Sequence, residues 1–261
     1  MSKSKFKIRC SAIGQIMTNA KGAITAKQLQ TIAELQLKEK LTPKQHENLN
    51  LLLNKKNAPV QISDTAKSFV DIWMKEQLYK RKFEFSNKYT EKGLKVENKS
   101  IEFLSDYFNV FLVKNVKRFT DNEFITGEPD IILKNEVWDV KNSWDCFTFP
   151  RFTPKDAKIN PVYYWQGQGY MALTGAENYK LIYVLSDTPE NLIEAEAWKY
   201  VRKNGFSELD IDTYEMFKKR MTYDDIPNED KVKVFEFKRN NEDIKRVEKR
   251  VLEIRSYLTQ F

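Results

Sequence analysis

The sequence is poor in the residues that build zinc sites and disulfide scaffolds, since its 261 residues include one histidine and two cysteines. A single histidine, His46, cannot form a zinc site alone, and we expect it to lie on the surface. Cys10 and Cys146 are far apart and indicate reduced thiols rather than a disulfide framework. The chain also lacks a run of about 18 apolar residues, so we expect no membrane-spanning helix.

The N-terminus and the overall composition narrow the class further. Residues 1–7 are charged and lack an apolar centre, so we expect no signal peptide. The two separated cysteines fit a cytoplasmic protein. The formal charge of +7 and the pI of about 9.1 fit a protein that binds a polyanion. Charge alone is weak evidence, because many basic proteins bind no nucleic acid.

The segment from Asp130 to Lys141 is the most informative part of the chain. It reads as a β-hairpin with its turn at Lys134-Asn135, and it carries two carboxylates and an ammonium group. Side chains alternate along a strand, so Asp139 and Lys141 share a face, whereas Val140 points away and leaves its carbonyl as a further ligand. Such oxygen donors suit Mg²⁺. An exposed hairpin with charged outer positions is the simpler alternative.

Two further segments favour a catalytic site. Glu97 lies four residues before Ile101, on the inward stripe of a helix expected over 88–108, where a buried charge must be paired or bound to a metal. Gln166 and Tyr170 are four residues apart, hence neighbours on one helix face. The glycines between them suit a close approach of the backbone to another group. The alternatives are a glutamate at the helix rim and a buried aromatic helix.

In this order, Glu97, Asp130, Asp139-Val140-Lys141 and Gln166-x-x-x-Tyr170 resemble the motifs of the PD-(D/E)xK nuclease superfamily. Within it, the sequence is most similar to the lambda-exonuclease and YqaJ-like phage recombination nucleases. The likeness spans residues 8–187, and its opening motif is the serine-containing segment 9–17.

The resemblance implies a Mg²⁺-dependent deoxyribonuclease, with Mn²⁺ able to substitute, in the cytoplasm of a bacterium or a phage-infected host cell. Metal ligands would be Asp130, Asp139, the carbonyl of Val140 and, directly or through water, Glu97. Lys141 would position or activate the water, Gln166 would orient Lys141 or the nucleophile, and Tyr170 would support that helix. Ser11 and Arg9 would contact the DNA.

Two departures from the family pattern are visible. The acid on the second strand, Asp139, is shorter than the usual glutamate. Where lambda-type enzymes have an arginine for the 5′ phosphate, seven residues before the serine, this chain has Ser4. With two cysteines the chain also lacks the four that the related iron–sulfur nucleases require.

The expected fold is α/β (α+β), a restriction-endonuclease-like core in which helices flank a central mixed β-sheet. We expect strands at 110–113, 123–127, 130–141, 180–186 and, at the edge, 231–238. A single nuclease domain would span 1–261. It would comprise an N-terminal helical insertion at about 24–57, a catalytic core at about 64–187, and C-terminal helices with the edge strand at 188–261.

The stretch from Asn142 to Pro161 interleaves aromatic and basic residues, which suits stacking on splayed bases. Trp144 and Arg151 are the candidate DNA contacts, and Phe152, Lys155 and Lys158 belong to the same pattern. The alternative is that the aromatic residues cover the core beneath the active site.

Three functions stay open at this point. The first is a 5′→3′ exonuclease on double-stranded DNA that acts in phage-type recombination, with a single-strand annealing protein as partner and a homotrimeric ring as assembly. The second is a structure- or site-specific endonuclease, and the third is a DNA-binding protein without catalysis. Apolar residues recur from Ile244 to Leu258 over about two heptads, and we expect them to pack within the subunit rather than join subunits.

Overall fold

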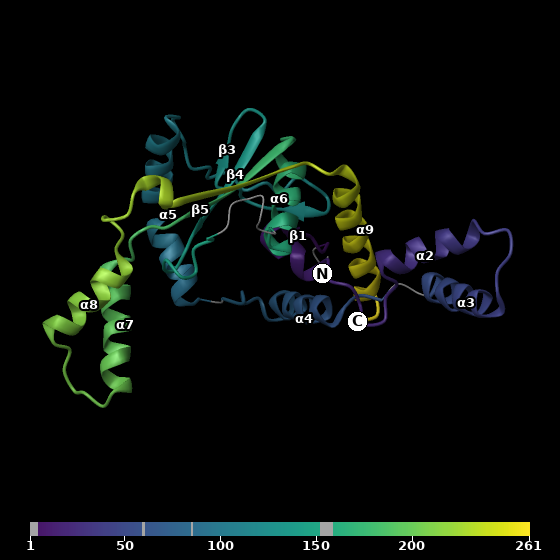
Figure 1. Cartoon of the computed structure of the whole chain (residues 1–261), viewed down its shortest axis with the longest axis horizontal. Coiled ribbons are helices and arrows are strands. Elements are labelled where there is room, and N and C mark those ends of the chain that lie inside the picture. The colour runs from purple at the N-terminus through teal and green to yellow at the C-terminus, as the bar shows by residue number, and fades with distance from the viewer. Residues whose placement is uncertain (1–4, 59–60, 85, 152–158) are drawn as a thin grey trace. The chain divides into compact units, whose positions relative to one another are not determined.

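Strand β4 (Glu136–Asn142) is the central element of the main sheet, with β3 (Ile131–Ile132) on one side and β5 (Asn178–Val184) on the other (Figure 1). β6 (Val232–Lys238) pairs with β5 and ends the sheet as its edge strand, as predicted. β4 runs parallel to β5, and the other two pairs are antiparallel. The mixed sheet and the hairpin over residues 130–141 are therefore confirmed.

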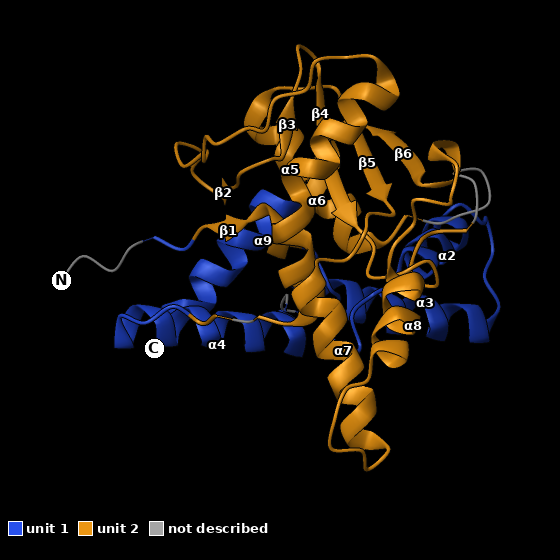
Figure 2. Cartoon of the chain, turned by 90° about the vertical axis from the view of Figure 1, so that its left-hand side faces the viewer, with its two compact units in different colours: residues 1–6, 14–82, 247–261 blue, residues 7–13, 83–246 orange. Residues whose placement is uncertain are grey.

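This computed structural model describes residues 5–58, 61–84, 86–151 and 159–261. The chain divides into two units (Figure 2). We call residues 7–13 and 83–246 the sheet unit, and residues 1–6, 14–82 and 247–261 the helical unit. The expectation of one domain over the whole chain stays a prediction.

Two helices cover the faces of the sheet. α5 (Lys88–Phe108) begins at Asn87, whose side chain accepts hydrogen bonds from the N–H groups of Tyr89 and Thr90. It packs on the face formed by the even-numbered residues of β4, where Ile101 and Leu104 join a buried cluster that also contains Leu112, Ile131, Trp138, Val140, Ile182, Val184 and Val232. α6 (Pro161–Thr174) packs on the opposite face. The alternation of side chains along β4 thus separates an apolar face from a face that carries Asp139 and Lys141.

The glycines of α6 permit a close approach to the sheet, as predicted. A Cβ atom at Gly167 would lie 2.6 Å from Cζ of Phe237 and 2.9 Å from Cδ1 of Tyr179. A Cβ atom at Gly169 would lie 2.9 Å from Sγ of Cys10. Both positions therefore favour glycine for steric reasons.

A second, two-stranded sheet holds the serine motif. β1 (Ile8–Arg9) pairs in parallel with β2 (Ile125–Thr126), and the 3₁₀ helix η1 (Cys10–Ala12) follows directly. The prediction that residues 123–127 belong to the main sheet is wrong, because their partner is the N-terminal strand.

The prediction of a strand at residues 110–113 is also wrong. α5 ends at Asn109 in the left-handed conformation, and the N–H of Val110 bonds back to the carbonyl of Ser105. The chain then makes only isolated bridges within the described residues up to β2, between Lys114 and Ile131 and between Phe119 and Gly127. Of the apolar residues here only Leu112 is buried, whereas Phe111 is 88% exposed. Apolar character without a pairing partner does not make a strand.

The rest of the sheet unit consists of α7 (Glu190–Lys203), α8 (Ile211–Met221) and the 3₁₀ helix η2 (Asn228–Asp230). α7 and α8 pack together over a buried cluster that contains Trp144, Leu192, Ile193, Ala197, Phe217 and Met221. This cluster extends the core beyond the end of β4.

The helical unit contains most of α1 (Ile13–Ile16), followed by α2 (Ala26–Gln36), α3 (Pro43–Asn57) and α4 (Asp64–Tyr79). Thr42 caps α3 as predicted, with Gln45 completing a capping box. His46 is exposed, as expected.

The C-terminal helix α9 (Asn241–Leu258) follows β6. Its apolar stripe is buried within the chain at Ile244, Val247, Val251 and Ile254, as predicted. Within the part of the chain that the structure describes, no helix is long and apolar enough to cross a membrane.

Candidate active site

Asp130 and Asp139 converge where β3 and β4 separate. The antiparallel register pairs Ile132 with Val137 and Ile131 with Trp138, so one step further places Asp130 opposite Asp139 on the same face. Oδ2 of Asp130 accepts a hydrogen bond from the N–H of Val140 over 2.7 Å. The backbone of β4 therefore fixes one carboxylate, and its side-chain direction fixes the other.

Asp139 is fully buried and is held by two side chains. Nζ of Lys141 lies 2.6 Å from Oδ2 of Asp139, and Nε2 of Gln166 donates to Oδ1 over 3.1 Å. Gln166 also contacts the hydroxyl of Tyr170 over 3.1 Å. The structure thus brings together the predicted set, but Gln166 contacts Asp139 rather than Lys141.

The local charges perturb both titratable partners of Asp139. Burial, followed by the charge of Asp139, raises the pKa of Asp130 from 3.8 to about 7. Burial alone would lower the pKa of Lys141, but the charges of Asp139 and Asp130 outweigh it and raise this pKa above its ordinary value. Lys141 is therefore cationic at neutral pH, and the two carboxylates resist sharing the site without a cation.

The donor set fits Mg²⁺. Continuing the β3–β4 register places Val140 opposite Pro129, which has no N–H, so the carbonyl of Val140 receives no ladder bond there. Oδ2 of Asp139 lies 2.6 Å from Nζ of Lys141, on the side of the carboxylate opposite to the oxygen that Gln166 binds. Across the described residues, no three His, Cys, Asp or Glu side chains converge on one point. Two carboxylates, one carbonyl and waters match the preference of Mg²⁺ for oxygen.

Glu97 lies on α5, close enough to Asp130 for its charge to act on it, and forms an ion pair with Lys114. Its Oε2 is 2.7 Å from Nζ of Lys114, and its charge contributes to the raised pKa of Asp130. The inward-facing glutamate is thus ion-paired, as the cost of burying a lone charge requires. This arrangement favours a contact to a metal through water over direct ligation.

Buried groups that sequence reasoning did not single out lie behind Asp139. The hydroxyl of Tyr179 on β5 is buried, and burial and the charge of Asp139 raise its pKa well above the ordinary value. Burial and Asp139 likewise raise the pKa of the Cys10 thiol. Both groups are therefore neutral, and they surround the carboxylate with a medium of low polarity. The sequence shows no signal for them, because their proximity comes from β5 and η1 packing on α6.

A row of aromatic rings flanks Lys141. Its Nζ lies 5.4 Å from the ring centroid of Tyr163, which contacts Tyr183 edge-on at 6.2 Å. Tyr183 is the register partner of Lys141 on β5. These rings limit the positions that the lysine side chain can adopt.

The four candidate DNA contacts differ in exposure. Arg9, Ser11 and Arg151 are exposed, the first two at β1 and η1 of the sheet unit. Trp144 is 8% exposed and packs against Tyr89 and the α7–α8 cluster, so its ring offers no face to a base. The prediction for Trp144 is therefore wrong, and the alternative of a core aromatic holds. Phe152, Lys155 and Lys158 lie outside the described residues.

Solved structures similar to this chain include exonucleases. A phage-related exonuclease from Haemophilus somnus 129PT matches with a TM-score of 0.70 and 27% identity, over 98% of this chain and 95% of that chain. An alkaline exonuclease from Laribacter hongkongensis matches with a TM-score of 0.54 and 12% identity, over 97% and 92% of the two chains. Its complex with dAMP gives a TM-score of 0.51 and 13% identity.

No protein-family model and no curated protein matches the sequence. The structural comparisons confirm the restriction-endonuclease-like α/β fold. They also confirm the resemblance to the PD-(D/E)xK nucleases of the phage recombination type.

Proposed function

We propose that this chain is a Mg²⁺-dependent exonuclease that hydrolyses double-stranded DNA from its ends in the 5′→3′ direction. The observation that carries this proposal is the set of Asp130, Asp139 and Lys141 around β4, with Gln166 behind it. The likeness to a phage-related exonuclease over nearly the full length of both chains supports action on DNA ends. We extend the proposal to a role in end resection for phage-type recombination, which the likeness to a phage-related exonuclease supports.

Asp130, Asp139 and the carbonyl of Val140 would hold the metal, and Glu97 would contact it through water. A Mg²⁺ ion held there would supply Lewis-acid polarisation of the scissile phosphate and a more acidic water as the nucleophile. Because Asp130 and Asp139 are fixed by the β4 backbone and by Gln166, these ligands are oriented before a metal binds.

Lys141 acts as a cation in this scheme. Its raised pKa keeps it protonated at neutral pH, so it offsets the charge that develops on the phosphate oxygens rather than removing a proton from water. The nearby ring of Tyr163 and the carboxylate of Asp139 hold its ammonium group in place.

Gln166 and Tyr170 act as positioning residues. The amide Nε2 of Gln166 lies 3.1 Å from both Oδ1 of Asp139 and the hydroxyl of Tyr170. This fork sets the rotation of the Asp139 carboxylate. Ser11 and Arg9, exposed on the same unit, are the proposed contacts to the DNA backbone. A homotrimeric ring and an annealing protein partner are further parts of the proposal.

The test is digestion of a linear duplex labelled at one 5′ end, beside a covalently closed circle of the same sequence. We expect Mg²⁺-dependent release of labelled mononucleotides from the linear DNA, an intact circle, and no reaction in EDTA. Cleavage of the closed circle would support the endonuclease instead. Tight binding of DNA without cleavage in Mg²⁺ or Mn²⁺ would reduce the protein to a DNA-binding module.

A further inference from the structure

A groove in the sheet unit combines aromatic rings with basic side chains. It has a volume of about 680 Å³ and lies between the loop that follows β4, the end of α8 and the start of β6. We name it the aromatic–basic groove and define it by Phe147, Phe149, Arg151, Lys219, Arg220 and Lys233. Trp144, the aromatic residue first considered for DNA, is buried and does not line it.

The sheet register connects this groove to the catalytic lysine. Lys141 on β4 pairs with Tyr183 on β5, and Tyr183 pairs with Lys233 on β6. Directly paired residues project from the same face of a sheet, so these three side chains form one row. Neighbouring strands are about 4.8 Å apart, which puts Lys233 roughly 10 Å from Lys141 along the row. A DNA strand whose phosphate lies at Lys141 therefore reaches the groove within a few nucleotides.

The charge of the groove is positive. Its described lining contains four cationic side chains, Arg151, Lys219, Arg220 and Lys233, and two carboxylates, Asp225 and Asp230. Positive charge that follows the path of a strand is what a phosphate backbone requires.

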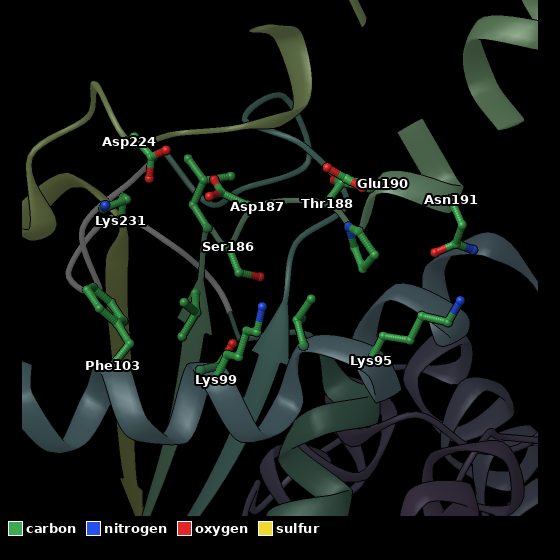
Figure 3. Close-up of a pocket in the computed structure, with 15 residues that line it drawn as sticks. Lys95, Lys99, Phe103, Ser186, Asp187, Thr188, Glu190, Asn191, Asp224 and Lys231 are labelled. Carbon is green, nitrogen blue, oxygen red and sulfur yellow. The ribbon is translucent and has the colours of Figure 1, made fainter. Parts of the chain in front are cut away.

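A second cavity of similar size provides the contrast. It has a volume of about 660 Å³ and lies between α5 and the segment after β5 (Figure 3). Its described lining holds three lysines and three carboxylates, so its charges balance; they are Lys95, Lys99, Lys231, Asp187, Glu190 and Asp224. This cavity gives a polyanion no advantage.

The rings indicate which form of DNA fits. Phe147 is 86% exposed and lines the groove, so its ring is accessible to a ligand there. Bases within a duplex are stacked on each other, whereas bases of a single strand are free to stack on aromatic side chains. The exposed ring of Phe147 and the half-buried ring of Phe149, beside cations, therefore suit single-stranded DNA better than duplex.

We propose that the aromatic–basic groove binds single-stranded DNA next to the catalytic site. The inference rests on the proposed nuclease function, since it assigns the groove to the unpaired strand that passes Lys141. Phe147 and Phe149 stack on bases, and Lys219 and Lys233 contact phosphates.

The first experiment measures binding without cleavage, in EDTA, by fluorescence anisotropy of a labelled oligothymidylate of about 10 nucleotides, within the range that such grooves cover. We expect the Lys219→Gln/Lys233→Gln double variant to bind at least 10-fold more weakly. Its slope of log affinity against log salt should fall by about 1.4, since each phosphate contact contributes about 0.7 for single strands. Phe147→Ala should weaken binding by about 5- to 100-fold. The matched controls are Lys199→Gln and Phe206→Ala, both exposed and outside the groove.

The second experiment locates the bound strand. Cys146 lines the groove and is exposed, whereas Cys10, the other cysteine of the chain, is buried and has a raised pKa. Saturating oligothymidylate should slow alkylation of Cys146 by iodoacetamide in the wild-type protein, measured by mass spectrometry. An unchanged alkylation rate, or groove variants that bind like the controls, would overturn the inference.

These outcomes are separable from the nuclease function. Groove variants that bind normally while the wild type degrades linear DNA would refute the groove and leave the proposed function intact. Protection of Cys146 in a protein that cuts no DNA would support the groove and refute the proposed nuclease function.

Discussion

The side-chain amide of Gln166 donates a hydrogen bond to Oδ1 of Asp139 over 3.1 Å, and this bond links α6 to β4. The other oxygen of Asp139 faces Lys141 at 2.6 Å. The two oxygens of Asp139 thus have different partners: Oδ1 binds the amide of Gln166, and Oδ2 faces the ammonium group of Lys141. Gly167 makes this possible, because it allows α6 to lie directly on Tyr179.

Gln166→Ala should impair the metal site without unfolding the protein. Loss of a residue that orients a metal ligand typically costs about 10- to 100-fold in metal affinity or activity. We expect a loss of this size in cleavage rate at low Mg²⁺, partly recovered at high Mg²⁺. Cleavage rates as a function of Mg²⁺ concentration measure both effects.

Gln168→Ala is the matched control for Gln166. Gln168 is also buried on α6, but it bonds the carbonyl of Lys238 and the N–H of Asn240, away from the carboxylates. It should lower the unfolding temperature and leave the Mg²⁺ dependence unchanged. Equal Mg²⁺ responses of the two variants would contradict a specific role for Gln166.

Lys141→Ala and Asp130→Asn should each abolish most cleavage while DNA affinity is retained. Removal of one group that stabilises developing charge costs about 100- to 1,000-fold in rate. We expect at least this loss in single-turnover cleavage, with anisotropy in EDTA reporting DNA binding close to that of the wild type. Full activity in either variant would mean that the site is assigned to the wrong residues.

The raised pKa of Asp130 predicts a pH-dependent response to Mg²⁺. In the folded protein this pKa is about 7, against an ordinary value of 3.8. The folded state therefore holds the proton more tightly, and the contribution of Asp130 to stability declines as the pH rises from about 4 to about 7. Mg²⁺ must displace the proton, so its stabilising effect should be small below about pH 6 and grow through about pH 7.

Thermal unfolding with and without Mg²⁺, over this pH range, measures that response. Asp130→Asn lacks the titrating group and should show a weak response to Mg²⁺ at every pH. A wild-type response that is large and constant across the range would refute the role of Asp130.

Two glycine-to-alanine substitutions should have opposite effects on stability. At Gly93, on α5, no atom lies within 4 Å of an added Cβ, so alanine should raise the free energy of unfolding by up to about 1 kcal/mol. At Gly167 the added atom would meet Phe237 and Tyr179, and this overpacking should lower the free energy of unfolding by about 1–3 kcal/mol. Chemical denaturation measures both; a stabilised Gly167→Ala variant would show that α6 does not lie against the sheet as described.

Local patterns along the chain were sufficient to predict the hairpin of residues 130–141 and the cap at Thr42. Each depends on neighbours in sequence: alternation along a strand, or a side chain that bonds a backbone group three residues on. The partners of Glu97 and Gln166 depend instead on packing, so the ion pair with Lys114 and the bond to Asp139 were not foreseen.

Two aromatic residues show the same limit. Trp144 and Phe147 are three residues apart in one loop, yet one is buried under α7 and α8 and the other is 86% exposed. Both are aromatic residues of the same loop, so composition does not distinguish them. The packing of α7 and α8 buries Trp144 and leaves Phe147 on the surface. Residues 110–113 show the same limit. Their apolar composition predicts a strand, but no strand of the described residues pairs with them.

Asp139 is proposed to serve metal-dependent hydrolysis, and a comparison of the wild type with Asp139→Asn on a linear duplex in Mg²⁺ tests this role. The substitution keeps the shape of the side chain and removes its charge. At equal occupancy of the DNA, we predict cleavage by the wild type and none by the variant above the level seen in EDTA. Cleavage by the variant at the wild-type rate would contradict this role.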